Sequence, residues 1–477
     1  MSDAYAQFQS AVQSHDMLAI SEAARALVKA APALGSGWAQ VAGAAMDAGD
    51  EPAALEAARH LAAASPDYPQ SFIWIASTLS AMGDHAGALA VLEAQLQRTP
   101  QLGELHRRAG RALMRLGRTA AAGERFKTAV AQDRGDVLAW EGVAETHAFT
   151  RGGDPWLLGM EELRIGFPGS ATAKTRGILS YALARAYDAL GDHEIAARRV
   201  AEAAAFYREE AAFDMDRHER AMAHIVNTYD DRFARANEDA GVIDARPVFV
   251  IAPPCAGADW LTKTLAAADG VASLDRRNAL FWMASSPLGD HDSDALLREL
   301  DLGESEGLFT RVAHTYLARM SERIGREVRR VIDPSALTEM AAGVMGLSLP
   351  AAKFIRLTRD PRDLAWAIYA RRFQRGRNWS YHPDDVARVL KCQQALCDRW
   401  EALFGERIHT VSYEALSEDP AGALRSLGTF LGVDSDAVAA EAWLRSDALK
   451  ADPVGVHARV GARFDPVEAA LKRAGLI

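Results

Sequence analysis

Two short turns carry the residue types best suited to binding an anion. The first turn follows an apolar run at 247–252, which is expected to be a buried parallel strand, and it leads into a helix that begins near Asp259. Its residues are Pro254, Cys255, Ala256, Gly257, Ala258 and Asp259. A strand, a glycine-bearing turn and a helix N-terminus together favour an anion, because backbone N–H groups and the helix dipole converge there.

The second turn, Arg359-Asp360-Pro361-Arg362-Asp363, follows an expected strand at 352–358 and precedes an expected helix at 364–373. Ligands bind at the carboxyl ends of strands in open α/β sheets, so the two turns predict one site. Between Lys353 and Arg377 there are eight basic residues against two acidic ones. A solvated basic helix face is the alternative interpretation of that charge run.

The rest of the chain is acidic, which makes any such anion site local. Asp and Glu number 64 against 54 Lys and Arg, giving a net charge of -10 and a pI near 5.8. This balance argues against nucleic acid or an anionic membrane as a partner. Neither a P-loop, nor G-x-G-x-x-G, nor G-x-S-x-G occurs at the strand-to-helix turn.

Cysteine usage and the N-terminal residues suggest a soluble, cytoplasmic protein. The cysteines, Cys255, Cys392 and Cys397, form neither a disulfide framework nor a four-ligand zinc pattern. The chain shows no signal-like start and no apolar run of membrane-spanning length. Asp290, His291, Asp292 and Asp294 could hold a metal, but a solvated loop is the preferred interpretation, so no metal is expected.

A repeat of 34 residues organises the first half of the chain. Gly49, Gly83 and Gly117 are spaced by that step, and so are the large residues and the prolines. The large residues are Trp38, Phe72, His106 and Trp140, and the prolines are Pro32, Pro66 and Pro100. Apolar residues at helical spacing on both sides of each glycine predict pairs of helices.

This pattern resembles the tetratricopeptide repeat family. The resemblance implies an α-solenoid over residues 1–215, with a concave groove that binds a protein or peptide partner. Alternatively, the array braces the next domain or dimerises it. The register is lost at 149–169, and a further unit follows a phase slip at 181–196.

A helical linker is expected at 216–245, followed by a three-layer α/β domain with a mostly parallel sheet at 246–477. The strand, turn and helix at 247–265, the stretch 354–363 and the Tyr413-Glu414 pair resemble the sulfotransferase superfamily, and more narrowly bacterial sulfotransferases that carry tetratricopeptide repeats. The resemblance implies a P-loop NTPase-like fold and 3′-phosphoadenosine-5′-phosphosulfate (PAPS) as co-substrate. It also implies sulfuryl transfer to a hydroxyl of a protein, peptide or glycan that the array recruits.

The residues at the family's site positions match unevenly. Arg359 falls on the arginine that contacts the nucleotide's 3′-phosphate, whereas Ala367 replaces the serine that assists it. The family writes Pro-Arg-Ser-Gly-Thr-Thr where this chain has residues 254–259, so the basic residue and the hydroxyls are lost. Asp275 is the expected general base, and the motif beginning at Asp333 lacks the family's lysine.

Asp259 is the most consequential of these changes. Two like charges about 4 Å apart at an effective dielectric near 20 repel by roughly 4 kcal/mol, which is about a thousandfold in affinity. The alternative function is therefore a catalytically degenerate sulfotransferase fold, which serves as a protein-binding scaffold or sensor through its repeats. PAPS or the desulfated nucleotide, adenosine 3′,5′-bisphosphate, is the expected nucleotide partner, and its binding would favour the enzyme over the scaffold.

Overall fold

The structure is a computed structural model that describes residues 3–14, 17–65, 68–210, 212–274, 307–325, 327–334, 338–373, 377–445 and 454–477. The chain divides into two compact units. The first comprises Met1–Ala212 together with residues 370–373, and the second comprises the rest of the described chain from Phe213 onward. Each unit is considered by itself.

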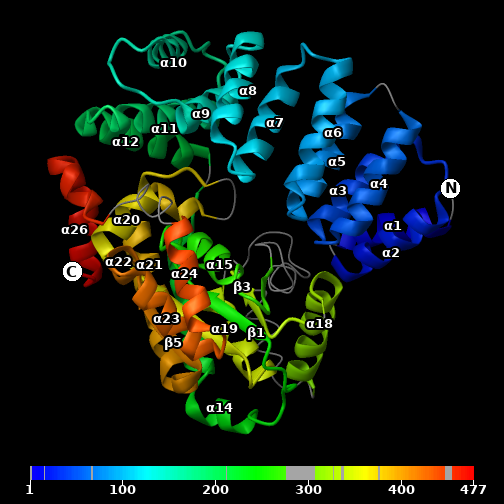
Figure 1. The fold of residues 1–477 in the computed structure, drawn as a ribbon, viewed down its shortest axis with the longest axis vertical. Helices are drawn as coiled ribbons and strands as arrows, with labels where there is room; N and C mark the ends of the chain where they lie inside the picture. The colour runs from blue at the N-terminus through cyan, green and yellow to red at the C-terminus, as the bar shows by residue number, and fades with distance from the viewer. Residues whose placement is uncertain are drawn as a thin grey trace. The chain divides into compact units, whose positions relative to one another are not determined.

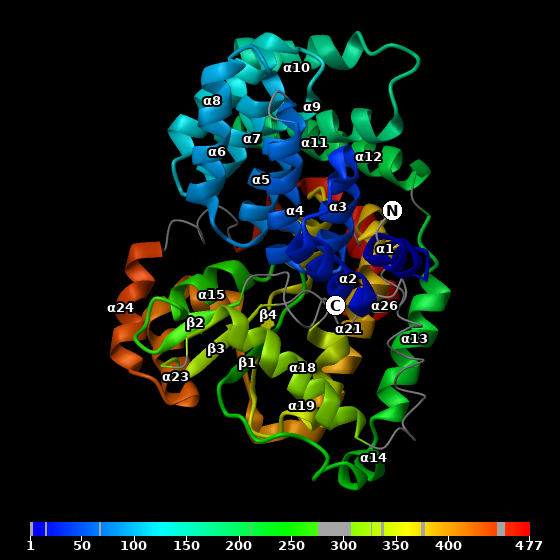
Figure 2. The same ribbon diagram turned by 90° about the vertical axis from the view of Figure 1, so that its right-hand side faces the viewer.

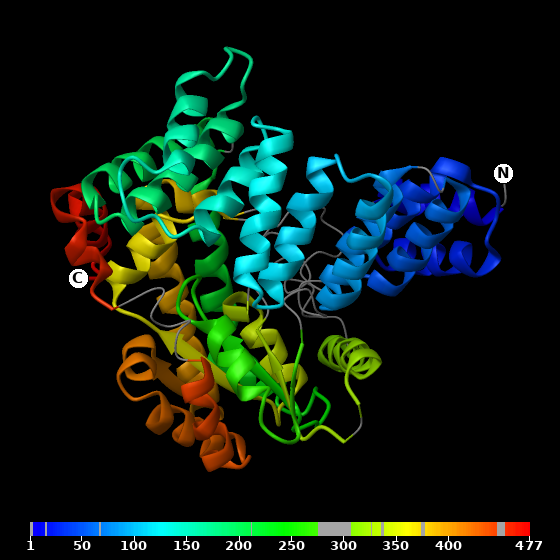
Figure 3. The ribbon, with the colours of Figure 1, turned by 45° about the horizontal axis from the view of Figure 1, so that its top comes forward.

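The first unit is built from consecutive helices that pack against their neighbours in chain order, as Figures 1 and 3 show from two directions. These helices are α1 (Asp3–Ser14), α2 (Met17–Ala30), α3 (Trp38–Asp47), α4 (Glu51–Ala64), α5 (Pro69–Ala81), α6 (His85–Arg98), α7 (Gly103–Arg115), α8 (Thr119–Gln132), α9 (Val137–Thr146), α10 (Pro155–Ile165), α11 (Ala173–Ala189) and α12 (His193–Glu210). A short 3-10 helix, Gly35–Gly37, precedes α3. The predicted helix pairs are therefore present.

The periodic glycines separate the two helices of a pair. Gly49, Gly83 and Gly117 have φ angles of +70°, +81° and +73°, a left-handed conformation that glycine adopts without a steric cost. The aspartate after each of the first two glycines then starts the next helix. The Asp50 carboxylate accepts a hydrogen bond from the Ala53 N–H, and that of Asp84 accepts one from the Gly87 N–H.

The stretch where the 34-residue register fails contains α10. Its N-cap is Asp154, whose carboxylate accepts from the N–H groups of Trp156 and Leu157 and also bonds His147 Nε2 at 2.8 Å. The unit expected after the phase slip is the pair α11 and α12, which pack extensively against each other. Gly191 between them has a φ of +81°, as the periodic glycines do.

A parallel sheet forms the centre of the second unit. Its five described strands run in the order β2-β3-β1-β4-β5, and every pairing among them is parallel. The strands are β1 (Pro247–Ile251), β2 (Val271–Ser273), β3 (Arg330–Asp333), β4 (Lys353–Thr358) and β5 (Ile408–Ser412). β1 is the middle strand and is buried along its whole length, as expected for a strand covered on both faces.

Helices cover both faces of this sheet, which gives the expected three layers (Figure 2). They are α13 (Met215–Thr228), α14 (Asp231–Ala236), α15 (Ala258–Leu265), α18 (Leu308–Arg323), α19 (Thr338–Ser348), α20 (Pro361–Tyr369), α21 (Pro383–Phe404), α22 (Tyr413–Glu418), α23 (Pro420–Leu431), α24 (Ser435–Arg445) and α26 (Asp465–Ala474). Short 3-10 helices lie at Asn378–Tyr381, Gly405–Arg407, Val456–Arg459 and Gly461–Phe464. Phe249 and Phe354 of the sheet join one core with Tyr316 of α18 and Trp400 of α21.

The segment 216–245, which the sequence predicts as a helical linker, contains most of α13 and all of α14. Its Met222, Ile225 and Tyr229 are part of the core of the second unit. The helix expected to reach Phe373 ends at Tyr369 as α20. Residues 370–373 instead belong to the first unit, where Arg372 donates a hydrogen bond to Glu141. No helix in the described part of the chain is long and apolar enough to cross a bilayer.

Candidate anion-binding site

The two predicted turns lie at the carboxyl edge of the sheet and contact each other. They follow β1 and β4, which are adjacent strands with Ile251 opposite Arg356. The Arg359 guanidinium donates from Nη1 to the Cys255 carbonyl at 2.8 Å, so the end of β4 is tied directly to the turn after β1. The sequence prediction that both turns share one edge of the sheet agrees with this geometry.

The first turn ends at a helix N-terminus whose N-cap is a glycine. Gly257 is the N-cap of α15 with a φ of +90°, and as a glycine it has no side chain with which to form a capping hydrogen bond. The positive φ favours glycine here, and a Cβ atom at Gly257 would also be tight against the Tyr413 ring, 3.0 Å away. The first N–H groups of a helix have no acceptor within that helix, and they carry the positive end of its dipole. This arrangement suits an anion.

Arg359 is the central side chain of the site. It is only 5% exposed, and its guanidinium carbon lies 4.3 Å from the centroid of the Tyr413 ring. This is a cation–π contact within a mostly desolvated environment. The neighbouring Glu414 accepts a hydrogen bond from the Asp360 N–H at 2.8 Å. Tyr413 and Glu414 therefore fix the second turn from β5.

The remaining turn residues differ in exposure. Ala256 is buried and its N–H donates to the Pro253 carbonyl at 3.3 Å, whereas the Asp259 side chain is exposed. Pro254 and Ala258 are half-buried. Cys255 has a φ of +66°, and its Sγ contacts the Ala367 carbonyl at 3.5 Å.

That contact places Ala367 next to the turn.

Asp275 and the loop 290–294 lie outside the described residues. Across the described ranges, no group of three or more His, Cys, Asp or Glu side chains could hold a metal ion.

The fold distributes the basic stretch 353–377 over several places. Lys353 Nζ donates to the Phe430 carbonyl at the C-terminus of α23, and it lies at the opposite, amino end of β4. Arg356 forms ion pairs with Glu401 at 2.8 Å and with Asp398 at 3.3 Å. Only some of the basic residues of this stretch therefore face the carboxyl edge of the sheet. Arg359 is one of these and is buried.

Asp363 in the first turn of α20 has a role that sequence analysis missed. Its carboxylate is buried and accepts from the N–H groups of Gly455 and His457 at 2.5 and 3.0 Å, and it bonds His457 Nδ1 at 2.5 Å. Burial raises the pKa of this carboxyl, but the hydrogen bonds from His457 and Gly455 outweigh it and hold the pKa below its ordinary value. No local sequence signal identifies a partner more than ninety residues away.

Asp333 at the end of β3 is also fully buried. The Tyr316 hydroxyl donates to its Oδ2 at 2.9 Å, and burial together with this carboxylate raises the pKa of Tyr316 well above its ordinary value. The carboxylate is thereby held against α18.

Comparison with known proteins agrees with this architecture. Residues 247–437 match the model of the sulfotransferase family, and residues 79–145 match the model of the tetratricopeptide repeat. A stretch that matches the tetratricopeptide repeat, residues 79–145, therefore precedes a stretch that matches the sulfotransferase family, residues 247–437.

Individual relatives are distant. An uncharacterized protein of Aquifex aeolicus (strain VF5) is 22% identical over 266 residues, which cover 54% of this chain and 35% of that protein. The match thus spans about a third of the relative's length. Among solved structures, a sulfotransferase from Alicyclobacillus acidocaldarius is 19% identical, covering 45% of this chain and 100% of its own at a TM-score of 0.29. A sulfotransferase from Mycobacterium tuberculosis H37Rv is 15% identical, covering 68% and 99%, also at a TM-score of 0.29.

Proposed function

We propose that the second unit binds PAPS and transfers its sulfuryl group to a hydroxyl of a protein, peptide or glycan that the repeat array recruits. The observation that carries this proposal is the turn between β1 and α15, which ends in a left-handed glycine at the N-terminus of α15 and whose Cys255 carbonyl accepts a hydrogen bond from the buried Arg359. In this proposal the backbone N–H groups at 257–259 hold the phosphosulfate. Arg359 holds the 3′-phosphate, because the planar guanidinium fork matches the geometry of a phosphate and can bond it at two points.

The residues of the chain would contribute electrostatics and positioning. Fixed N–H dipoles stabilise charge that develops on the leaving phosphate, and they need no reorganisation during the reaction. Tyr413 and Gly257 hold the turn and Arg359 in place, so this preorganisation is built into the fold. Asp275, by its resemblance to the family position, would accept the proton of the acceptor hydroxyl.

Calorimetric titration with adenosine 3′,5′-bisphosphate tests the nucleotide site. We expect micromolar binding to the full chain, and Arg359→Ala should weaken it at least about tenfold because a charge-assisted contact is lost. Arg425→Ala is the matched control, since Arg425 lies on α23 with its side chain 55% exposed, and it should leave the affinity unchanged. Absence of heat with the unaltered chain would overturn the proposal.

A catalytically silent scaffold is the second candidate function. It is favoured by the exposed carboxylate of Asp259 in the first turn of α15 and by the missing hydroxyls at residues 256, 258 and 259. If Asp259 repels the donor, the double change Ala258→Thr and Asp259→Thr should raise nucleotide affinity by about tenfold or more. Binding that appears only in this double variant would favour the scaffold, and an affinity that does not change would refute the repulsion.

A further inference from the structure

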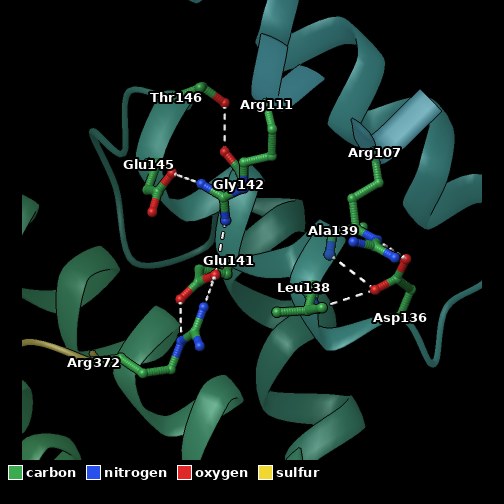
Figure 4. A network of polar contacts seen from close by, with 10 residues as sticks. All are labelled: Arg107, Arg111, Asp136, Leu138, Ala139, Glu141, Gly142, Glu145, Thr146 and Arg372. Carbon is green, nitrogen blue, oxygen red and sulfur yellow. Dashed lines mark hydrogen bonds and ion pairs between the residues drawn. The ribbon is translucent and has the colours of Figure 1, made fainter. Parts of the chain in front are cut away.

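The repeat unit binds an arginine that comes from far along the chain. Arg372 lies after α20, in the segment that belongs to the first unit. Its Nε donates to Glu141 Oε1 and its Nη2 to Glu141 Oε2, both at 2.7 Å, which is a bidentate arrangement (Figure 4). The two side chains are only 10% and 12% exposed. A desolvated, two-point contact of this kind is selective for a guanidinium over an ammonium.

Three helices form the site around this guanidinium. Glu141 and Glu145 lie on α9, and Arg111 of α7 bonds both of them, with Nη2 at 2.7 Å from Glu141 Oε2. Tyr207 of α12 also interacts with Arg372. Gly177 makes room for the Tyr207 ring, which lies 2.7 Å from where a Cβ at that glycine would be. The ring position is therefore fixed by packing.

Without Arg372, the described charged side chains of this site do not balance, and one further positive charge would neutralise them. Two carboxylates, Glu141 and Glu145, face one guanidinium from Arg111, so the site carries one net negative charge before Arg372 enters. Burial lowers the pKa of Arg372, but the hydrogen bond from Arg372 to Glu141 and the negative charge of Glu141 raise that pKa by more. The net effect is a pKa above the ordinary arginine value, so Arg372 is charged throughout the accessible pH range. Charge complementarity thus specifies the occupant as a cation, and the fork geometry specifies an arginine.

The segment that supplies the occupant has no regular structure. α20 ends at Tyr369, and the described residues that follow it up to Phe373 are in neither helix nor strand. Arg371 is exposed, whereas Arg372 is held. The site therefore accepts a single arginine from an irregular peptide segment, which is also how a separate chain could present one.

We propose that Glu141, Glu145, Arg111 and Tyr207 form an arginine-binding site of the repeat array, that Arg372 occupies it in cis, and that an arginine-bearing peptide of a partner takes the same site when Arg372 leaves. This proposal is independent of sulfuryl transfer. A tethered arginine competes at an effective concentration on the order of millimolar, so a partner peptide binds the unaltered chain only weakly. Occupancy by the partner and docking of the segment after α20 are then mutually exclusive.

Fluorescence anisotropy with a labelled peptide tests this competition in the full-length chain, without nucleotide. The probe carries the sequence of residues 370–374. We expect Arg372→Ala to bind it at least about tenfold more tightly than the unaltered chain, because the tethered competitor is removed. Arg371→Ala is the matched control and should behave as the unaltered chain does. Equal binding by Arg372→Ala and the unaltered chain would overturn the proposal.

Two further measurements establish that the peptide occupies the Glu141 site. Adding Glu141→Gln to Arg372→Ala should abolish the increase in probe affinity that Arg372→Ala produces. A probe with citrulline in place of the arginine that corresponds to Arg372 should not bind. Binding that survives either change would contradict the proposed site. If Arg372→Ala fails to fold by circular dichroism, Arg372→Lys keeps the charge without the fork, and it should bind the probe more tightly than the unaltered chain does.

Discussion

Two buried charged side chains near the first turn of α20 bind different parts of the chain. Arg359 is a cation that holds the turn after β1 through the Cys255 carbonyl and stacks on Tyr413. Asp363 is an anion that holds the C-terminal segment through Gly455 and His457. Each satisfies its charge with specific partners, as buried ionised groups require. A change at either residue leaves polar groups without partners, and at Asp363 the cost depends on the protonation state of the carboxyl.

Asp363→Asn tests this at the level of one residue. The folded-state pKa of Asp363 is lowered, so its charge contributes stability above the ordinary carboxyl value of 3.8, and that contribution is lost as pH falls through the lower folded value. At pH 7 we expect the variant to lose about 2–3 kcal/mol, because three donors lose a charged acceptor. The difference in melting temperature between the two proteins should shrink below pH 3.8.

The exposed Asp436 supplies the control for that measurement. Its side chain is 83% exposed and pairs with Arg425, so Asp436→Asn should change stability by less than about 0.5 kcal/mol at any pH. A melting difference for Asp363→Asn that is independent of pH would show that its effect does not depend on ionisation.

At the level of elements, the sequence predicted what periodicity and turn chemistry determine. The spacing of Gly49, Gly83 and Gly117 gave the helix pairs, because a left-handed residue between two helices favours glycine. The end of α20 at Tyr369 could not be predicted, since the continuing residues have helical pattern and leave the helix for a contact with Glu141 on α9. The His457 partner of Asp363 was missed for another reason, because no local sequence signal identifies a contact across more than ninety residues.

In the helices of the array, replacing a glycine by alanine is expected to raise the melting temperature at one position and to lower it at another, depending on how closely a neighbouring helix approaches. A Cβ on Gly142 of α9 would lie 2.3 Å from the ring of Phe126, which is fully buried, whereas a Cβ on Gly43 of α3 would lie 3.5 Å from Trp74. Alanine is favoured over glycine in a helix by about 1 kcal/mol, so Gly43→Ala should raise the melting temperature. Gly142→Ala should lower it, because overpacking costs about 1–3 kcal/mol. Thermal unfolding followed by circular dichroism gives the signs, and a rise for both variants would mean that Phe126 can move aside.

At the level of the whole molecule, the net charge of -10 and the anion site oppose each other. The sequence predicted a local basic site from the run 353–377, but the fold places Lys353 at the amino end of β4 and Arg372 on Glu141. Arg359 is a buried cation of the candidate site. Fewer exposed cations therefore lie near the proposed nucleotide position than the run 353–377 suggests, while the net negative charge of the chain is unchanged.

This balance predicts an unusual response of nucleotide affinity to salt. The Debye length shortens from about 30 Å at 0.01 M salt to about 10 Å at 0.1 M, so the repulsion from the acidic chain is screened over this range. The proposed contact of the nucleotide with Arg359 should be screened much less, because that side chain is only 5% exposed. Affinity for adenosine 3′,5′-bisphosphate, measured by calorimetry, should therefore rise from 0.01 to about 0.1 M salt. Uncharged adenosine should show no such rise. A steep fall over the same range would mean that several exposed cations contact the nucleotide, and that the acidic balance of the chain does not reach the site.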